Sequence, residues 1–600
     1  MCGILGSTTT QSNTERLKKA TDTLLHRGPD YQGVYQDADI YISHLLLAIR
    51  GSTEESKQPV FHAGNPWVLV FNGQLYNTKQ ICNTLNVSNS GVDTTLLYKL
   101  IEKFGWDFID HIQGMFAIAL YNSHEKIIRL YRDQSGQKGL YYRQNESGFH
   151  FASEIKGVLS LPNAQRSIDV YSLELAQRIG YIPGNRTLVK DLFKVMPSEI
   201  VAYDLNRKAL SQKLFNTSDQ NYYAGLTPHQ VLHTVVEEHL QSKRDLSINL
   251  SGGLDSSLIF HEAVQSGRNV TAFSTLFDVD EEVYNRDAVL AKRLAQEYGQ
   301  EFTEILITKE SYLDNFIDSY KTIEEPNFNI SVPIYYQTAK REGVNGKGLR
   351  VVLSGDGGDE LFGGYPHYAE MARLQKLRAH YTLLGLNLYK WYRNKKFINY
   401  GESAEAFYAL RGFTKSWTDE DPNHRNVLSY LHSITDEVTA QNAHKQDGVY
   451  RLMLLDRYVW LASENFIRSD KLYMSQSMEM RCPLAYQPLR TYMDMHIPSS
   501  EYTSRQSNKL FLRNLYADKL PTYITKRMDK TGWRAPVEIW YDKTYKTLFL
   551  DIITSVEKRN ADINWNAIKK KIESSDTWPG KTAHLYLSIA LTILSLDLHD

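Results

Sequence analysis

The chain has 600 residues, 42% of them hydrophobic and 23% charged, and its formal net charge is −1 at pH 7. A single hydrophobic core stops growing near about 250–300 residues, so this length predicts at least two domains. The near-neutral balance argues against the broadly basic surface of nucleic-acid-binding proteins, and the composition is that of an ordinary globular protein rather than a disordered or membrane one.

Three cysteines occur, Cys2, Cys82 and Cys482, too few and too scattered for a disulfide framework or a metal-ligand motif. We therefore expect a protein of the reducing cytoplasm. No basic stretch followed by a long apolar core opens the chain, so no signal peptide is expected. The longest apolar run, 585–596, is shorter than the roughly 18 residues of a membrane span, and it predicts a buried terminal helix.

Cys2 would carry both a thiol and a free α-amine if Met1 were removed. An α-amine has a pKa of roughly 7.7–8.0, so it can accept the thiol proton near neutral pH. Taken alone, a cysteine here is more often a small residue in a buried strand. The runs that follow favour a nucleophile: they are His26–Asp30, Phe71–Asn77 and Gly114–Ala117.

Together with Cys2, these runs resemble the glutaminase domain of class II amidotransferases, an N-terminal-nucleophile (Ntn) fold with two antiparallel sheets between helices. The resemblance implies that Asn72 and Gly73 form the oxyanion hole, because an amide side chain and a backbone N–H can both donate to an oxyanion. An Asn-Gly pair is also the commonest hairpin turn. The resemblance further implies glutamine contacts by Gln74 and Asp93; the latter could otherwise be a helix cap.

Two positions depart from that family. It places an arginine for the glutamine α-carboxylate two residues after a histidine, where this chain has Leu46 after His44. Arg50 is the nearest candidate, but in a continuous strand it would lie roughly 13 Å from Leu46. Gln74 stands where the family often has glutamate, and it brings no charge. We therefore predict glutamine hydrolysis with weakened charged recognition of glutamine.

Farther along, an apolar strand expected at 246–250 leads into Ser251–Ser257, a glycine- and serine-rich loop that opens a helix. Glycines let backbone N–H groups converge, serines add hydroxyl donors, and the helix N-terminus supplies partial positive charge, so the loop suits phosphates. A Walker loop would have a lysine after its last glycine, whereas here Asp255 is available for a divalent cation. A plain glycine turn is the alternative. The run resembles the loop of ATP pyrophosphatases, which adenylate a substrate.

A second strand, expected at 351–353, ends in Ser354–Tyr365, which is rich in glycine and aspartate. Helices alternating with short apolar runs predict a parallel sheet covered on both faces, and in such a sheet loops gather at the carboxyl ends of the strands. Asp255 and Asp359 should therefore face one Mg²⁺-pyrophosphate unit as hard oxygen ligands. A glycine-rich surface turn is the alternative.

Taken in order, Cys2 and the two loops resemble the glutamine-hydrolysing asparagine synthetases over most of the chain. The resemblance implies ATP and Mg²⁺ as cofactors. It implies that Asp356 acts in ammonia attack or substrate contact and that Lys509 stabilises charge on the phosphates, although a helical lysine is ordinarily solvated. The ATP-binding residues that it implies are Leu250, Ser251, Gly252, Gly253, Asp255, Ser256, Ser257, Thr275, Ser354 and Gly355.

The expected fold combines α+β and α/β classes. Residues 1–210 should form an αββα Ntn-hydrolase sandwich. Residues 225–600 should form a doubly wound parallel-sheet domain of the PP-loop, Rossmann-like type with helical additions. The polar run 216–221 is typical of a linker.

The acceptor of the amide nitrogen is less determined. Residues 324–333 resemble the family's loop near the aspartate site, and 479–486 correspond to a run that often ends in aspartate, where this chain has Tyr486. Aspartate is the default acceptor, and a uronic acid of a surface sugar would fit the changed position. A β-lactam synthetase and a catalytically silent binding protein are further alternatives.

The expected partners are small molecules: glutamine, ATP and a carboxylate acceptor. No nucleic acid and no membrane span are expected, and a homodimer is left open. The basic, aromatic segment 373–396 is interpreted as the exposed side of an inserted helical pair rather than as a membrane or nucleic-acid surface.

Overall fold

The computed structural model of the chain describes residues 2–9, 14–88, 92–215, 222–345, 349–373, 422–440, 448–504, 507–529, 534–560 and 562–599. The linker expected at 216–221 lies outside these residues. So does the basic segment 373–396, apart from its first residue.

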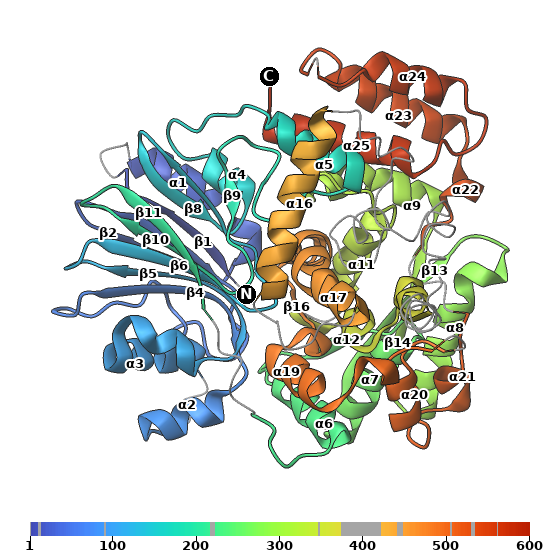
Figure 1. Ribbon diagram of the computed structural model, residues 1–600, viewed down its shortest axis with the longest axis horizontal. Coiled ribbons are helices and arrows are strands. Elements are labelled where there is room, and N and C mark those ends of the chain that lie inside the picture. The colour runs from blue at the N-terminus through green and yellow to red at the C-terminus, as the bar shows by residue number, and fades with distance from the viewer. Residues whose placement is uncertain are drawn as a thin grey trace, which may run out of the picture.

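Residues 3–214 form a sandwich of two antiparallel sheets (Figure 1). The first sheet has the strand order β2-β3-β1-β8-β7-β9 and the second β11-β10-β6-β5-β4. The strands are β1 (Gly3–Ser7), β2 (Tyr31–Gln36), β3 (Tyr41–Leu46), β4 (Trp67–Leu75), β5 (Gly114–Asn122), β6 (Ile127–Arg132), β7 (Tyr141–Asn145), β8 (Gly148–Ala152), β9 (Phe193–Lys194), β10 (Glu199–Asp204) and β11 (Ala209–Leu214). The last of them pairs with β10, so the sandwich runs four residues past the expected boundary at 210.

Helices cover both outer faces of the sandwich. The first sheet is contacted by α1 (Thr14–Asp22) and α4 (Ile155–Leu159), and the second by α3 (Asp93–Phe104), which packs beside α2 (Thr78–Leu85). The short helices η1 (Leu25–Arg27) and η2 (Gly105–His111) and helix α5 (Val170–Ile179) complete the domain. The expected αββα layering is confirmed.

Strand β5 explains why these residues stack in layers. Successive side chains of a strand point to opposite faces. Ala117 and Ala119 belong to the apolar cluster between the two sheets, whereas Phe116, Ile118 and Leu120 belong to the cluster under α2 and α3. A central strand with both faces buried is apolar throughout, and β5 is buried along its whole length.

The second domain is built on a parallel sheet with the order β14-β13-β12-β15-β16. Its strands are β12 (Leu246–Asn249), β13 (Val270–Phe277), β14 (Phe302–Ile307), β15 (Val351–Leu353) and β16 (Glu479–Arg481). Right-handed crossovers put α7 (Leu254–Gln265) and α8 (Glu282–Glu297) on one face and α11 (Val332–Asn345) on the other, because the chain first runs outward to β14 and then returns to β15. The expected doubly wound sheet is confirmed.

The strand order reverses between β12 and β15, which are hydrogen-bonded neighbours. In open α/β sheets, ligands bind outside the carboxyl ends of the strands at such a switch point. Both glycine-rich loops leave the sheet here, one from each strand.

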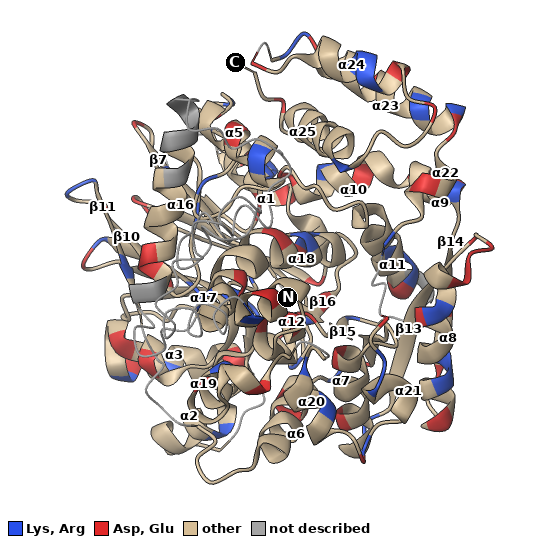
Figure 2. Cartoon of the chain, turned by 45° about the vertical axis from the view of Figure 1, so that its right-hand side comes forward, with Lys and Arg blue, Asp and Glu red and all other residues tan. Residues whose placement is uncertain are grey.

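The remaining helices surround the sheet. They are α6 (Pro228–His239), α9 (Lys309–Asp314), α10 (Phe316–Ile323), α12 (Gly358–Phe362), α16 (Pro422–Ala440), α17 (Gly448–Leu455), η3 (Asp456–Asn465), α18 (Phe466–Met474), η4 (Pro483–Ala485), α19 (Gln487–His496), η5 (Ser499–Glu501), α20 (Leu510–Leu515), α21 (Thr522–Thr525), α22 (Val537–Trp540), α23 (Lys543–Val556), α24 (Trp565–Glu573) and α25 (Lys581–Leu596). The last contains the apolar run predicted as a buried helix, and most of that run is buried. Among the described residues, no helix has the length and hydropathy to cross a membrane. Acidic and basic residues are intermixed along the described chain (Figure 2).

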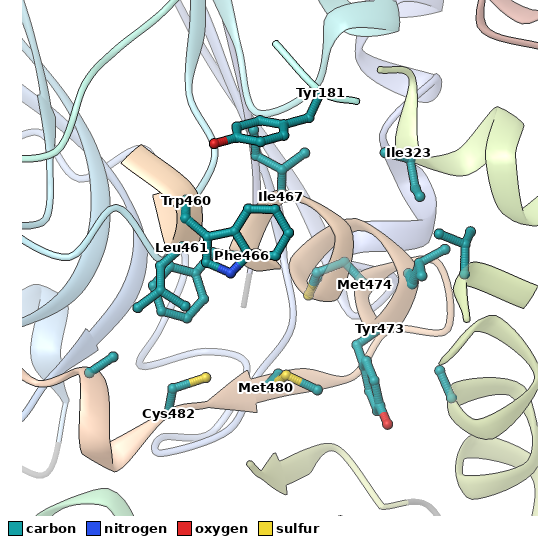
Figure 3. Packing of buried hydrophobic residues seen from close by; sticks show 14 of the residues in the cluster. Tyr181, Ile323, Trp460, Leu461, Phe466, Ile467, Tyr473, Met474, Met480 and Cys482 are labelled. Atoms are coloured by element: carbon teal, nitrogen blue, oxygen red, sulfur yellow. The ribbon is translucent and has the colours of Figure 1, made fainter. Parts of the chain in front are cut away.

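A continuous helix made of α17, η3 and α18 lies over β16. Its middle part, η3, is a π-helix of 10 residues, a rare conformation that is frequent at functional sites. Figure 3 shows Met480 and Cys482 of the β16 segment on the side that faces this helix, beneath Phe466 and Met474. An apolar layer thus separates the helix from the strand.

Candidate active sites

Cys2 lies just before β1 and is buried. Its nitrogen, which becomes the α-amine if Met1 is removed, donates to Oδ1 of Asn72 over 2.8 Å. Nδ2 of Asn72 is buried and has no hydrogen-bond partner in the described part of the chain. Burial raises the pKa of the Cys2 thiol, so the thiol needs a base to become a nucleophile.

Gly73 follows Asn72 on β4, where a side chain has no space. A Cβ at this position would stand 2.1 Å from the carbonyl oxygen of Met115 on the paired strand β5. The two residues predicted as the oxyanion hole are therefore neighbours on a fixed strand. The side-chain amide of Asn72 is available as a donor beside Cys2.

A small cavity of about 50 Å³ opens next to Cys2, and Arg50 and Asp93 both line it. Their side chains form an ion pair of 2.5 Å. The backbone of Leu75 holds both: its N–H donates to Asp93 over 3.2 Å and its carbonyl accepts from Arg50 over 3.2 Å. Burial raises the pKa of Asp93, and Arg50 opposes that effect. The cavity thus carries both charges that complement an amino-acid zwitterion.

Arg50 reaches the cavity because β3 ends at Leu46. The estimate of roughly 13 Å assumed a continuous strand, and the chain leaves the strand before Arg50. Leu46 lines the same cavity with an apolar surface. Leu46 replaces the arginine of the family, but Arg50 supplies a guanidinium group to the cavity.

Gln74 lines the cavity, but both polar atoms of its side-chain amide form hydrogen bonds with other residues of the protein. Its Oε1 accepts from Nη2 of Arg481 over 3.0 Å, and its Nε2 donates to the carbonyl of Leu75 over 3.2 Å. We predicted that the side-chain amide of Gln74 contacts glutamine directly. These two hydrogen bonds do not favour that contact.

In the second domain, the two glycine-rich loops touch. A Cβ on Gly355 would lie 3.0 Å from the backbone nitrogen of Ser256, and one on Gly358 would lie 2.6 Å from Cγ of Asp255. Gly252 has φ +64°, and a Cβ there would lie 2.5 Å from a carbonyl oxygen of α8. The expected juxtaposition of Ser251–Ser257 with Ser354–Asp359 is confirmed.

Lys509 connects the same two loops. Its ammonium group contacts Asp255 and lies 2.6 Å from Asp359. The residue is buried and adopts a left-handed conformation at the N-terminus of α20. Burial would lower the pKa of Lys509, but the two carboxylates outweigh it and raise the pKa. Lys509 is thus a charged partner of the phosphate loop rather than a solvated side chain.

Asp255 and Asp359 fit a divalent cation, because their carboxylates already approach one common positive charge. Within the described residues, no group of three or more His, Cys, Asp or Glu side chains is arranged to hold a metal ion. Mg²⁺ is commonly held by one or two carboxylates with phosphates and water completing its shell. Two carboxylates beside a phosphate loop match that arrangement.

The remaining predicted nucleotide residues surround this cluster. The buried hydroxyls of Ser257 and Thr275 have no hydrogen-bond partner among the residues that the structure describes. The hydroxyl groups of Ser251 and Ser256 lie 3.0 Å apart. Gly253 caps the N-terminus of α7, and buried Leu250 links the loop to β13 through its backbone N–H. Unpaired buried hydroxyls are costly, so a polar ligand would stabilise them.

Asp356 belongs to the second loop, and its side chain contacts the π-helix η3. One carboxylate oxygen accepts from the hydroxyl of Ser354 over 3.0 Å, and the other from Nδ2 of Asn465 over 3.4 Å. Burial raises the pKa of Asp356, and Arg468 opposes that effect. The side chain is therefore fixed by both elements.

Sequence reasoning missed Glu464 and Arg468, which lie next to Asn465 and around Asp356. Nε of Arg468 donates to Glu464 over 2.9 Å, and Nδ2 of Asn327 donates to the same oxygen over 3.1 Å. Nη1 of Arg468 and Oε2 of Glu464 are buried and unpaired within the described ranges. The signal was available: Glu464 and Arg468 are opposite charges four residues apart in the helical stretch 459–474, which also carries Asp470 and Lys471.

The segment 324–333 reaches the proposed acceptor pair through Asn327, which donates to Glu464, and its first residues also contribute to the domain interface. Glu324 pairs with Lys471 over 2.9 Å and accepts from the backbone of Ile155 in the first domain. Glu325 pairs with Lys194 over 3.0 Å. The Tyr486 ring packs edge-on against Tyr76, with centroids 5.2 Å apart. The changed residue Tyr486 therefore takes part in interdomain packing.

Comparisons with known proteins match both halves. A family described as glutamine amidotransferase domain matches residues 1–216, and one described as asparagine synthase matches residues 229–593. Asparagine synthetase (glutamine-hydrolyzing) 1 of Bacillus subtilis is 24% identical over 571 residues, covering 90% of this chain and 88% of that protein. Asparagine synthetase B of Escherichia coli is 27% identical over 429 residues, covering 68% and 73%. Amidase chyE of Penicillium rubens is 23% identical over 632 residues, covering 94% and 91%.

Proposed function

This chain belongs to the asparagine synthase family and is a glutamine-hydrolysing, amide-forming ligase, and we propose that its acceptor is aspartate and its product asparagine. One observation carries the ligase chemistry on which the proposal rests. Asp255, Asp359 and Lys509 meet where two glycine-rich loops leave adjacent parallel strands, in a chain that also pairs the Cys2 nitrogen with Asn72.

In the first half-reaction, the Cys2 thiol attacks the side-chain carbonyl of glutamine. The α-amine exposed by loss of Met1 accepts the thiol proton, directly or through water. Nδ2 of Asn72 and the N–H of Gly73 donate to the oxyanion. The tetrahedral intermediate then collapses: its C–N bond breaks, protonated ammonia leaves, and a glutamyl thioester on Cys2 remains. Water hydrolyses this thioester to release glutamate and the free thiol.

Arg50 and Asp93 hold the backbone end of glutamine. Their ion pair of 2.5 Å opens so that the guanidinium takes the α-carboxylate and the carboxylate takes the α-ammonium group. The substrate replaces an existing charge pair, so its net gain is smaller than that of two free charges. This exchange supports the expectation of weakened charged recognition of glutamine.

In the second half-reaction, the loops Ser251–Ser257 and Ser354–Asp359 bind ATP. Backbone N–H groups of the first loop and the N-terminus of α7 hold the phosphates. Asp255 and Asp359 would hold Mg²⁺, which would neutralise charge on the phosphates. A carboxylate oxygen of the acceptor attacks the α-phosphorus of ATP, and Lys509, which contacts Asp255 and Asp359, stabilises the charge that develops as pyrophosphate leaves. Ammonia then attacks the carbonyl carbon of the acyl-adenylate, the amide forms and AMP leaves.

The pair of Glu464 and Arg468 supports an α-amino acid as the acceptor. One guanidinium nitrogen and one carboxylate oxygen are buried without partners beside Asp356, within the described ranges. The α-carboxylate and α-ammonium groups of aspartate would satisfy both. A uronate would satisfy only the guanidinium and leave a buried carboxylate oxygen unpaired, which is costly.

An acceptor screen tests this proposal. AMP and pyrophosphate release are measured with ammonium, ATP and Mg²⁺, and with aspartate or a panel of uronates. We expect aspartate-dependent AMP and none with the uronates. AMP with a uronate alone would move the assignment to a sugar acid. The absence of ATP–pyrophosphate exchange with every acid tried would favour a silent binding protein.

A further inference from the structure

Strand β16 at the edge of the parallel sheet carries one residue that contacts both candidate sites. Arg481 is fully buried, and its carbonyl oxygen accepts from the backbone N–H of Ser354 over 2.9 Å. Ser354 is the first residue of the second nucleotide loop. The main chain of Arg481 therefore fixes the point at which that loop begins.

The side chain of the same residue reaches the first domain. Nη2 of Arg481 donates to Oε1 of Gln74 over 3.0 Å. The remaining donors are anchored in the second domain: Nε bonds Glu479 over 2.6 Å, and Nη1 bonds the carbonyl oxygens of His239 and Gln241 over 2.5 and 2.9 Å. A planar guanidinium held at three corners has little freedom, so movement of β16 displaces its contact with Gln74.

Gln74 connects Arg481 with the residues that line the glutamine cavity. It follows Gly73 directly, and its Nε2 donates to the carbonyl of Leu75. That carbonyl also accepts from Arg50, and the N–H of Leu75 holds Asp93. One side chain thus connects Arg481 with the oxyanion residues and with the pair that faces glutamine.

Glu479 adds a second contact from the same strand. It lies two residues before Arg481, on the same face, and lines the Cys2 cavity from the second domain. Burial would raise the pKa of Glu479, but nearby positive charges, Arg481 foremost, outweigh it and lower the pKa. The glutamine cavity is therefore closed in part by the edge strand of the nucleotide-binding sheet.

We propose that Arg481 is a positioning residue that couples the two sites, so that nucleotide bound by the Ser354 loop changes the reactivity of Cys2 through Gln74. This inference rests on the proposed function. Nucleotide orders the start of the loop, Arg481 follows through its backbone, and Gln74 then holds the end of β4 that carries the N–H of Gly73. Coupling between sites commonly changes affinity by about 5–150-fold.

The test follows Cys2 alone and needs no acceptor. The full-length protein is treated with 6-diazo-5-oxo-L-norleucine, an electrophilic analogue of glutamine, and alkylation of Cys2 is timed by mass spectrometry with and without MgATP. We expect MgATP to accelerate alkylation about fivefold in the parent protein. In Arg481→Lys, which keeps a charge beside Glu479 but loses the fork, the ratio should fall to near one.

Variants on the other side of the contact separate coupling from folding. Gln74→Leu cannot accept the hydrogen bond and should also bring the ratio near one, whereas Gln74→Glu makes a charged pair with Arg481 and should keep or raise it. The double variant Arg481→Lys/Gln74→Leu should be no worse than either single variant, because both act on one contact. Arg490→Lys is the matched control: Arg490 is buried at the same domain interface but contacts Ser135 and Tyr458 instead.

The outcomes separate the two proposals. A Cys2 that never reacts with the analogue would overturn the proposed glutaminase function and the coupling together. A reactive Cys2 whose rate ignores MgATP would overturn the coupling alone. A purely structural role of Arg481 would slow alkylation equally with and without MgATP and leave the ratio intact, which would also overturn the proposal.

Discussion

Around Cys2, the proposed oxyanion donors sit inside a strand, whereas the proposed nucleotide ligands sit on loops beyond the ends of strands. Asn72 and Gly73 belong to β4, which pairs with β5 along its whole length. Asp255, Asp359 and Lys509 come from three distant segments that meet through their charges. The backbone hydrogen bonds of the sheet fix a donor on β4 even without a ligand. The loop residues, by contrast, are held in place by ion pairs with one another. We therefore expect the first site to tolerate loss of neighbouring charge better than the second.

Replacing the nucleophile should produce the largest effect and should separate the two sites completely. Cys2→Ala is expected to abolish glutamate release from glutamine, because no other residue can form the thioester. AMP formation with ammonium chloride as nitrogen source should stay near the parent rate. Both rates are measured on the same preparation, and glutamate released at the parent rate would contradict the role of Cys2.

Breaking the charge cluster of the nucleotide site should come next. Lys509→Met is expected to lower ammonium-dependent AMP formation about 10²–10³-fold, the usual cost of losing one group that stabilises transition-state charge. Glutamine hydrolysis should change much less. Lys292→Met, at a lysine that is 45% exposed and pairs with Glu304, is the control. Equal losses in both half-reactions would mean that Lys509 supports folding instead.

Within the strand-based site, removing the guanidinium should weaken binding more than chemistry. Arg50→Ala is expected to raise the KM for glutamine about 10–100-fold, since a hydrogen bond to a charged group contributes about 1.5–3 kcal/mol. The value of kcat should fall only a few-fold, because Cys2 and Asn72 stay in place. Arg50→Lys should recover part of the loss. An unchanged KM would show that another group binds the α-carboxylate.

The smallest expected effect is on the pH dependence of stability, through Glu342 beside the sheet of the second domain. Burial raises the pKa of Glu342 to about 8, where hydrogen bonds from Ser247 and Tyr473 oppose it. The unfolded chain releases this proton near 4.5 and the folded one only near 8. The stability that protonated Glu342 contributes is therefore full below the lower pKa and is lost as pH rises through the higher one.

Glu342→Gln should remove that dependence. Between pH 6 and 8.5, the melting temperature of the parent is expected to fall by roughly 2–4 °C more than that of the variant. Differential scanning calorimetry at both pH values checks this. Parallel curves for the two proteins would show that Glu342 does not titrate in this range.

Local patterns predicted the parts of both sites that lie within single segments. The strand before Ser251–Ser257 and its loop could be read from consecutive residues, and so could Asn72 and Gly73. The same holds for the second loop, whose place beside the first follows from the rule that ligands bind at the carboxyl ends of parallel strands. These predictions needed only backbone geometry and the order of strands.

Other residues depend on where the chain turns and on how the domains dock. Arg50 faces the glutamine cavity because β3 ends at Leu46, which no periodicity marks. The ring of Tyr486 packs against Tyr76 of the other domain, a neighbour that nothing local in the sequence marks.

By itself, the sequence determined the two kinds of chemistry, because nucleophile, glycine turns and acidic ligands occur at short, readable spacings. Only the tertiary structure decided which polar side chains meet: Arg50 with Asp93, Lys509 with two aspartates, and Arg481 with the neutral Gln74. The residues of each meeting stand between 43 and 407 positions apart, so nothing local in the chain relates them. Buried charges require partners, but the fold chooses which partner is within reach.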